Sequence, residues 1–233
     1  DSRGTLMKNR AALLLLATLV PASHLSAVEF SACYCDKHLL PQPTKLVPGR
    51  KYARDRLIDI QHLKLDVTPD FAKRTIRATA TLSFKPIARP LAKLELDAVD
   101  LRIDKVECKG AVLVDRDVSA EKLTLTFAQP IAADAEATVT ISYSTQPQRG
   151  LYFCTPEMGY KPGDTQLWSQ GEAELHRFWF PSYDYPNERF TSEVICHVPA
   201  DMQVISNGKL LSQRKGADGL TDWHWLQDKP HVN

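Results

Sequence analysis

Residues 169–190, SQGEAELHRFWFPSYDYPNERF, bring together four acids, two arginines, a histidine and six aromatic residues between two stretches with the pattern of β-strands. Gln170 and Glu172 lie two positions apart, so in an extended segment their side chains would share one face. An amide and a carboxylate held together beside a wall of aromatic side chains form a candidate working site. The alternative is an irregular corner between two sheets, in which polar residues only brace a turn.

The same stretch has the features of a fixed, irregular loop. Pro181 and Pro186 exclude a regular helix or a central strand, because proline has no amide hydrogen to donate. The aromatic side chains are too numerous to remain in water, so we expect the loop to pack against the domain. We also expect Arg177 and Asp184 to form an ion pair that braces it. Bracing alone does not explain why an amide and a carboxylate stand together at the front of the loop.

The segments that position this loop are predicted to be β-strands. In residues 76–84 apolar and polar residues alternate, which is typical of a strand with one face on a core and the other in water. Residues 57–67 also alternate, with a phase slip at residues 61–62 that predicts a β-bulge. Asp218–Gly219, between two further alternating segments, predicts a hairpin. Without an amphipathic helix of three turns, the pattern indicates an all-β fold, a twisted β-sandwich.

The chain contains no self-sufficient catalytic motif. Its seven histidines are scattered, and no two form the H-E-x-x-H pair that places two zinc ligands on one helix face. There is no G-x-S-x-G nucleophile elbow, and no cysteine lies in a recognisable nucleophile motif. Lysine plus arginine (29) nearly balance aspartate plus glutamate (28), so the basic surplus typical of nucleic-acid-binding proteins is missing. We expect no active site within this chain and no nucleic-acid partner.

Residues 1–27 are predicted to be upstream residues followed by a secretory signal peptide. A basic start at residues 7–10 precedes the apolar run AALLLLATLV and a small-residue exit near Ala27. The run is too short to cross a bilayer, which needs about 20 apolar residues; a buried core helix is the alternative. We therefore expect an exported protein, whether periplasmic, extracellular or surface-attached, with no transmembrane helix in its mature form.

Residues 28–52 are predicted to form a proline-rich linker before a folded domain at residues 53–233. Cys33 ends a faintly lipoprotein-like F-S-A-C sequence, so lipid anchoring there stays open. Cys33, Cys35 and His38 provide too few ligands for a closed zinc site. The cysteine count is odd, so at least one thiol has no partner in the chain. The three cysteines beyond residue 100 are expected to be inert core residues, and disulfide pairing stays open.

The candidate site has the spacing of a known family. Q-x-E, an arginine five residues after the glutamate and F-P-x-x-D-x-P occur here within residues 170–186. The match continues through EVICHVP and, five residues later, I-S-N-G, and through the opening stretch ARDRLIDIQHLKLDV. Over residues 53–233 the sequence resembles the N-terminal β domain of the M1 zinc aminopeptidases, the aminopeptidase N-like gluzincins. Ser182 and Tyr185 depart from the family pattern, in which a cysteine and an acid are common.

The resemblance implies a division of labour between two domains. In the family, H-E-x-x-H and a later glutamate hold the catalytic zinc in a thermolysin-like domain that follows the β domain, and the G-x-M-E-N exopeptidase motif lies there too. Neither motif occurs in this chain. We therefore expect a fragment that is inactive and binds no metal by itself, whose full-length parent is a zinc enzyme that removes N-terminal amino acids from peptides.

Within this chain the resemblance implies that Gln170 and Glu172 bind the N-terminus of the peptide substrate. An aminopeptidase must recognise a free α-ammonium group, and a partly buried carboxylate can anchor that cation through a charge-assisted hydrogen bond worth about 1.5–3 kcal/mol. Glu172 is expected to be this anchor, and Gln170 to shape the pocket for the first side chain. Arg177 and Asp184 keep their bracing role. The alternative function is a non-catalytic β-sandwich module that serves binding or scaffolding.

Overall fold

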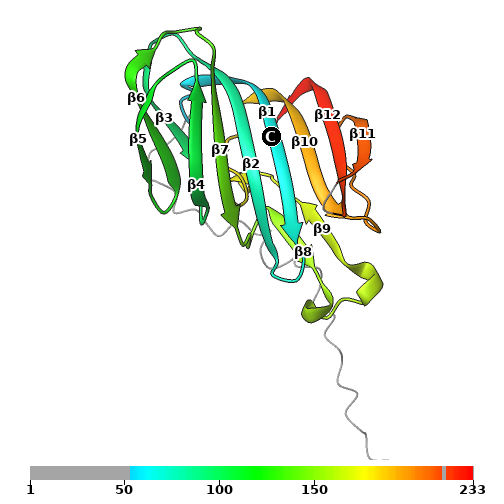
Figure 1. The fold of residues 1–233 in the computed structure, drawn as a ribbon. Helices are drawn as coiled ribbons and strands as arrows, with labels where there is room; N and C mark the ends of the chain where they lie inside the picture. Colours follow the sequence, from blue (N-terminus) through cyan, green and yellow to red (C-terminus); the bar gives the residue numbers. More distant parts are fainter. Residues whose placement is uncertain (1–52, 217–218, 233) are drawn as a thin grey trace, which may run out of the picture. The chain divides into compact units, whose positions relative to one another are not determined.

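β-Strands make up nearly all of the regular structure in the computed structural model, which describes residues 53–216 and 219–232 (Figure 1). Within these residues only three short 3-10 helices accompany them. The predicted all-β class is confirmed. The signal peptide, the linker and the possible anchor at Cys33 were predicted for residues 1–52, which lie outside the described part.

The elements are labelled in chain order. The strands are β1 (Ile58–Asp70), β2 (Thr75–Pro86), β3 (Leu91–Asp97), β4 (Arg102–Lys109), β5 (Leu113–Val118), β6 (Lys122–Ile131), β7 (Ala137–Thr145), β8 (Leu151–Cys154), β9 (Gln166–Ser169), β10 (Arg189–Pro199), β11 (Lys209–Lys215) and β12 (Leu220–Val232). The 3-10 helices are η1 (Pro156–Met158), η2 (Pro162–Asp164) and η3 (His176–Phe178).

The strands form three sheets. A seven-stranded sheet has the order β11-β12-β10-β1-β2-β7-β4, a second sheet has the order β3-β6-β5, and β8 pairs with β9 in a small hairpin. Figure 1 shows this hairpin at one end of the large sheet. All pairs are antiparallel except β1 with β10, which run parallel.

Strand β1 carries the bulge that its sequence predicts. Its register against β2 shifts between Ile60 and His62, at the slip in the hydrophobic alternation. The extra residue returns the apolar positions after the slip to the face used before it. The apolar residues on both sides of the bulge are buried: Ile58, Ile60, Leu63, Leu65 and Val67.

The core lies where the large sheet meets the three-stranded sheet. Alternate residues of β2 and β7 are buried, as expected for strands with one wet face. They share one hydrophobic cluster with residues of β3 and β6, such as Leu96 and Leu125. Phe180 and Tyr183 belong to the same cluster. The loop that contains the candidate site is therefore anchored in the core.

Two further predictions concern the C-terminal hairpin and the thiols. Strands β11 and β12 pair antiparallel as expected, although Asp218 of the turn lies outside the described residues. Cys108, Cys154 and Cys196 are free thiols. Burial raises the pKa of Cys196 to about 12, so this thiol is not reactive at neutral pH. Over residues 53–216 and 219–232, the structure contains no helix long and apolar enough to cross a membrane.

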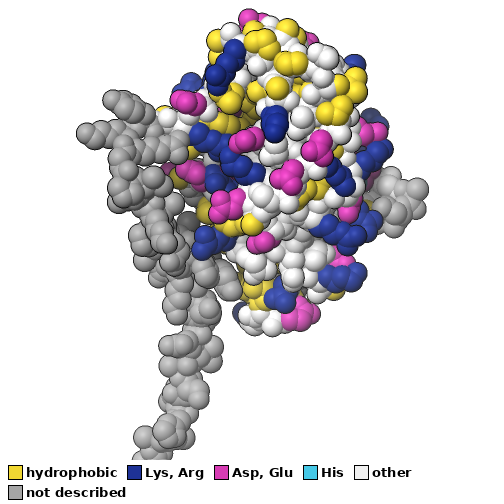
Figure 2. Space-filling view, turned by 90° about the vertical axis from the view of Figure 1, so that its left-hand side faces the viewer, with side chains coloured by type: hydrophobic (Ala, Val, Ile, Leu, Met, Phe, Trp, Pro, Cys, Tyr) yellow, Lys and Arg dark blue, Asp and Glu magenta, His cyan; other side chains and the backbone are white. Residues whose placement is uncertain are grey.

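The surface that carries the three-stranded sheet is mixed in charge. Figure 2 shows basic and acidic side chains interspersed there with apolar ones, in agreement with the small net charge of +1. This face therefore presents no continuous area of one charge sign that would attract a polyanion.

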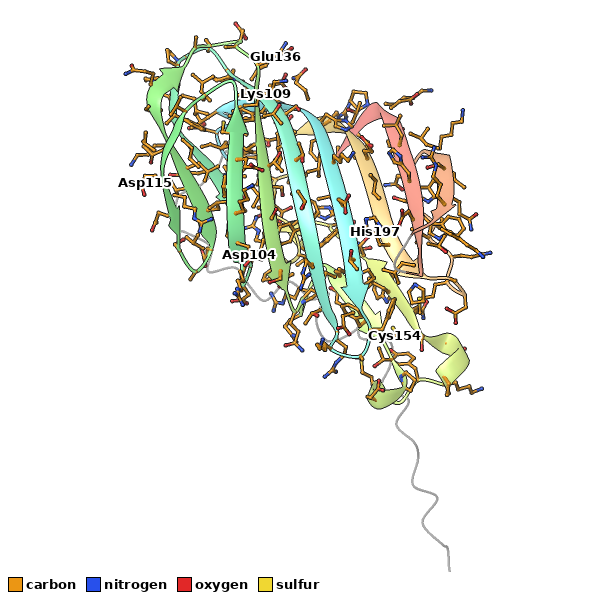
Figure 3. All side chains as sticks on the ribbon, in the orientation of Figure 1. Asp104, Lys109, Asp115, Glu136, Cys154 and His197 are labelled. Carbon is orange, nitrogen blue, oxygen red and sulfur yellow. The ribbon has the colours of Figure 1, made fainter. Side chains whose placement is uncertain are left out.

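A histidine on β10 joins three neighbouring strands of the large sheet (Figure 3). The Nδ1 atom of His197 is 2.6 Å from Asp222 Oδ1 on β12, and its Nε2 atom is 2.9 Å from Asp66 Oδ1 on β1. Partial burial by itself lowers the pKa of His197, but the hydrogen bonds to Asp222 and Asp66 outweigh it, so the pKa is raised above its ordinary value. The protonated ring is therefore favoured by folding.

Replacing His197 with glutamine should reduce stability more in mild acid than in mild base. The folded-state pKa lies above the unfolded value of 6.5, so the contribution of His197 is fully present below that value and is lost as pH rises through the folded-state pKa. Urea unfolding of the variant and the wild type at about pH 5.5 and about pH 8.5 measures the difference. An equal loss at both pH values would exclude a role for the charge.

Candidate functional site

Gln170 and Glu172 lie immediately after hairpin β8–β9. The backbone N–H of Gln170 donates to the carbonyl of Gly150 at 2.9 Å, which extends the hairpin pairing past the end of β9. The chain then turns, and the N–H of Leu175 donates to the carbonyl of Gly171 at 2.9 Å. Main-chain hydrogen bonds therefore hold the segment at both ends.

The two side chains have different surroundings. Gln170 is half-buried, whereas Glu172 is exposed. β9 ends at Ser169, and Glu172 begins a turn at the surface of this domain. Among the described residues, neither side chain has a hydrogen-bond or ion-pair partner. Both are thus available to a ligand.

An aromatic wall follows this edge in the chain. The ring of His176 in η3 lies 4.9 Å from the ring of Phe180 and 6.3 Å from that of Trp179, and the Trp179 and Phe180 rings meet edge-to-face at 4.5 Å. Trp179, Phe180 and Tyr183 are buried and Phe178 is half-buried. The expected packing of these aromatic residues is confirmed.

A pocket of about 270 Å³ opens beside the wall. Apolar residues of β1 and β10 line much of it, and His176, Ser169 and His231 contribute polar groups. Burial lowers the pKa of His176 to about 4, and the charge of His231 adds to this effect. His176 is therefore neutral near pH 7.

Arg177 and Asp184, predicted as a brace, are brought together by the fold. The backbone N–H and the Nε–H of Arg177 both donate to Asp184 Oδ2 at 3.0 Å, and a guanidinium N–H donates to the Asp184 carbonyl at 2.8 Å. The Asp184 carboxylate is fully buried. Burial raises its pKa to about 6, against the opposing effect of the hydrogen bonds from Arg177. The pair closes the loop between these two residues.

Two more buried carboxylates extend the brace to the start of the domain. Arg54 pairs with Asp97, whose carboxylate also accepts a hydrogen bond from the backbone N–H of Asp184 at 3.0 Å. Arg56 pairs with the fully buried Glu188 at 3.0 Å. Sequence reasoning missed both pairs because the partners are 43 and 132 residues apart. The only signal was that both arginines lie in the stretch ARDRLIDIQHLKLDV.

The brace stabilises the loop through buried ion pairs. Each of its three carboxylates is at least 96% buried in its side chain and is paired with an arginine, as buried charges require. Together they connect the strap at residues 54–56, the end of β3 and the loop at residues 177–188. The exposed edge at residues 170–172 is therefore joined to a fixed base, the loop that these three ion pairs hold in place.

The described residues do not fit the zinc ion that the family resemblance implies. Over residues 53–216 and 219–232, no group of three or more histidine, cysteine, aspartate or glutamate side chains is arranged to hold a metal. A zinc site needs three or four such ligands at once.

Solved structures of zinc metallopeptidases share this fold. A variant of an M1 zinc metallopeptidase from Deinococcus radiodurans, bound to a Tyr-Ser-Ala substrate, matches with a TM-score of 0.64 and 22% identity over 76% of this chain and 41% of that chain. A two-domain M1 zinc metallopeptidase variant bound to L-tryptophan matches with a TM-score of 0.64 and 21% identity over the same shares. The fold is thus the β domain found in zinc metallopeptidases.

The sequence identifies the family itself. The model of the Peptidase M1 N-terminal domain matches residues 59–232, so the chain belongs to the M1 peptidase family and the predicted family is confirmed. Leukotriene A-4 hydrolase from Xenopus laevis is 27% identical over 172 residues, and aminopeptidase B from Mus musculus is 23% identical over 188 residues. These matches cover 70% and 68% of this chain but only 28% of each relative.

Proposed function

We propose that this domain forms the amine-binding side of the substrate site in an exported zinc aminopeptidase that removes N-terminal residues from peptides. One observation carries the proposal. Glu172 is a carboxylate without a cationic partner in the described part of the chain, and it stands with Gln170 at the edge of a braced aromatic wall.

The charges of the loop favour Glu172 over its neighbours as the anchor. A carboxylate recognises a free α-ammonium group because it attracts the cation and accepts its N–H groups. An acid that already pairs with an arginine is less able to attract and bind a second cation. The other three acids of residues 169–190 are paired: Glu174 and Asp184 with Arg177, and Glu188 with Arg56.

Gln170 is suited to a second role at the same edge. Its side chain is half-buried and its backbone N–H is bonded to Gly150, so the side chain starts from a defined point of the backbone. Its amide can donate to a substrate carbonyl or limit the space for the first side chain. We assign Gln170 this shaping role.

The exposure of Glu172 supports a role for a second domain in the proposed site. In water, solvent screening weakens the attraction between a carboxylate and an ammonium group. A wall placed over Glu172 would exclude that water and strengthen the bond. We propose that a thermolysin-like domain encoded after residue 233 supplies this wall together with the zinc ion. The short coverage of the metallopeptidase structures, 41% of their chains, supports this arrangement.

Characterising the complete protein purified from its natural source tests the proposal. Mass spectrometry should show a chain that begins after the signal peptide, near residue 27, and that extends past residue 233 into H-E-x-x-H and G-x-M-E-N motifs. A chain that retains residues 7–20 would contradict export. A longer chain lacking both motifs would favour the non-catalytic binding or scaffold module.

The 233-residue chain provides the control for this test. Purified alone, it should hydrolyse no aminoacyl-anilide and bind no stoichiometric zinc, because its described residues offer no zinc site. Zinc-dependent turnover by this chain would overturn the proposed division between the domains.

A further inference from the structure

The residue between Gln170 and Glu172 lies directly against the ring of His176. A Cβ atom placed on Gly171 would be 1.9 Å from His176 Nε2 and 2.1 Å from its Cε1 atom, far inside van der Waals contact. The φ angle of Gly171 is outside the left-handed region. A side chain at this position would therefore require the His176 ring to move, whereas the backbone conformation itself does not demand glycine.

The ring that occupies this space is itself held in place. The carbonyl of His176 accepts hydrogen bonds from the N–H groups of Trp179 and Phe180 at 2.9 and 3.0 Å. Its ring packs near the rings of the same two residues. The next residue, Arg177, is fixed by its three hydrogen bonds to Asp184. His176 thus connects the braced base to the edge at Gly171.

The chemical state of His176 indicates that its role is packing. Its Nδ1 atom is buried and has no hydrogen-bond partner in the part of the chain that the structure describes. Burial keeps the ring neutral near pH 7. A neutral ring with an unpaired nitrogen contributes here through its shape.

We infer that His176 is a positioning residue that fixes the backbone of Gly171 and thereby holds Gln170 and Glu172 in register with the bound peptide. The inference rests on the proposed amine-binding function. Its importance follows from geometry, because displacing a binding group by about 1 Å can reduce the rate by as much as about 100-fold. The contact with the ring also stabilises the turn that the Leu175–Gly171 hydrogen bond closes.

Amide hydrogen exchange in the 233-residue chain tests the positioning without any substrate. His176→Ala should raise the exchange rate of the Leu175 amide by about tenfold or more, while His176→Phe, which refills the space, should restore the wild-type rate. His224→Ala is the matched control, since that histidine contacts Glu193 and lies away from the loop. Unchanged exchange in His176→Ala, or no rescue by phenylalanine, would overturn the inference.

A double-mutant cycle in the complete enzyme tests the functional consequence. Gly171→Ala should raise KM for an aminoacyl-anilide by about tenfold with kcat changed by less than about twofold. In the His176→Ala background, the same change should raise KM by less than about twofold, because the new methyl group no longer meets the ring. Equal effects in both backgrounds would contradict the contact.

The measurements on the His176 variants, compared with the kinetics of Glu172→Ala in the complete enzyme, separate this inference from the proposed function. If His176→Ala loosens the Leu175 amide but Glu172→Ala leaves kinetics unchanged, the positioning stands and the amine site is wrong. If Glu172→Ala impairs the enzyme but neither His176 variant affects exchange or KM, the amine site stands and His176 has no positioning role.

Discussion

Replacing Glu172 with alanine in the complete enzyme is expected to lower kcat/KM for an aminoacyl-anilide by about tenfold or more. A charge-assisted hydrogen bond contributes about 1.5–3 kcal/mol, and about 1.4 kcal/mol corresponds to a factor of ten. The loss should be similar for substrates with different first side chains, because in the proposed site Glu172 contacts the α-ammonium group that all of them share. Steady-state kinetics with several aminoacyl-anilides measures it.

Glu174→Ala is the matched control for this prediction. Glu174 is an acid two residues further along the same turn, but it already pairs with Arg177 at a partly exposed position. Its loss should leave the proposed ammonium site intact and remove only a weak, partly exposed ion pair, so kcat/KM should change by less than about fivefold. Equal losses in the two variants would show a general charge effect, and an unchanged value for Glu172→Ala would remove Glu172 from the site.

Replacing Arg177 with alanine should destabilise the 233-residue chain by about 3 kcal/mol or more. The change removes the two side-chain hydrogen bonds to Asp184 and takes the Arg177 guanidinium away from the fully buried Asp184 carboxylate. The backbone N–H of residue 177 remains, so part of the contact survives. A loss of this size is a large fraction of a typical domain stability of about 5–15 kcal/mol. Urea unfolding followed by tryptophan fluorescence measures it.

Two variants control for general effects of losing an arginine. Arg102→Ala breaks an ion pair with Asp104 that is 84% exposed at the arginine, and should change stability by less than about 1 kcal/mol. Arg177→Lys keeps the charge but loses the planar guanidinium group with its several N–H donors. The stability of this variant should lie between those of Arg177→Ala and the wild type. If Arg177→Ala and Arg102→Ala caused equally small losses of stability, the brace would not stabilise the loop.

The fold was predictable because the strands have one face in the core and one in water. Apolar and polar residues therefore alternate along each strand and give the sequence a two-residue period. The interruption of this period at residues 61–62 coincides with the bulge. The irregular loop was also predictable, since Pro181 and Pro186 exclude the alternatives locally. In each case the signal and the structure it predicts occupy the same few residues.

The parts that could not be predicted depend on contacts between distant residues. Nothing near Arg54 indicates that its partner is Asp97 at the end of β3, and Gly171 looks like an ordinary turn glycine until the ring of His176 is placed against it. The exposure of Glu172 was missed for a different reason. The two-residue spacing from Gln170 suggested a strand, but β9 had already ended.

In the proposed function, the braced loop would allow an exposed edge to bind a peptide with defined geometry. A substrate site built on a flexible turn would lose binding energy to ordering the turn each time a peptide binds. Here three arginine–carboxylate pairs and the aromatic wall fix the base before any ligand arrives. The departures from the family pattern at Ser182 and Tyr185 lie within this base and outside the edge at residues 170–172.

The central claim is that Glu172 recognises the α-ammonium group, and an inhibitor pair tests it most directly. An amino acid hydroxamate and its analogue without the α-amine are compared on wild-type enzyme and on Glu172→Gln. Wild type should prefer the amine by about tenfold or more, and the variant should bind the two inhibitors about equally. A preference that is unchanged in Glu172→Gln would contradict the account.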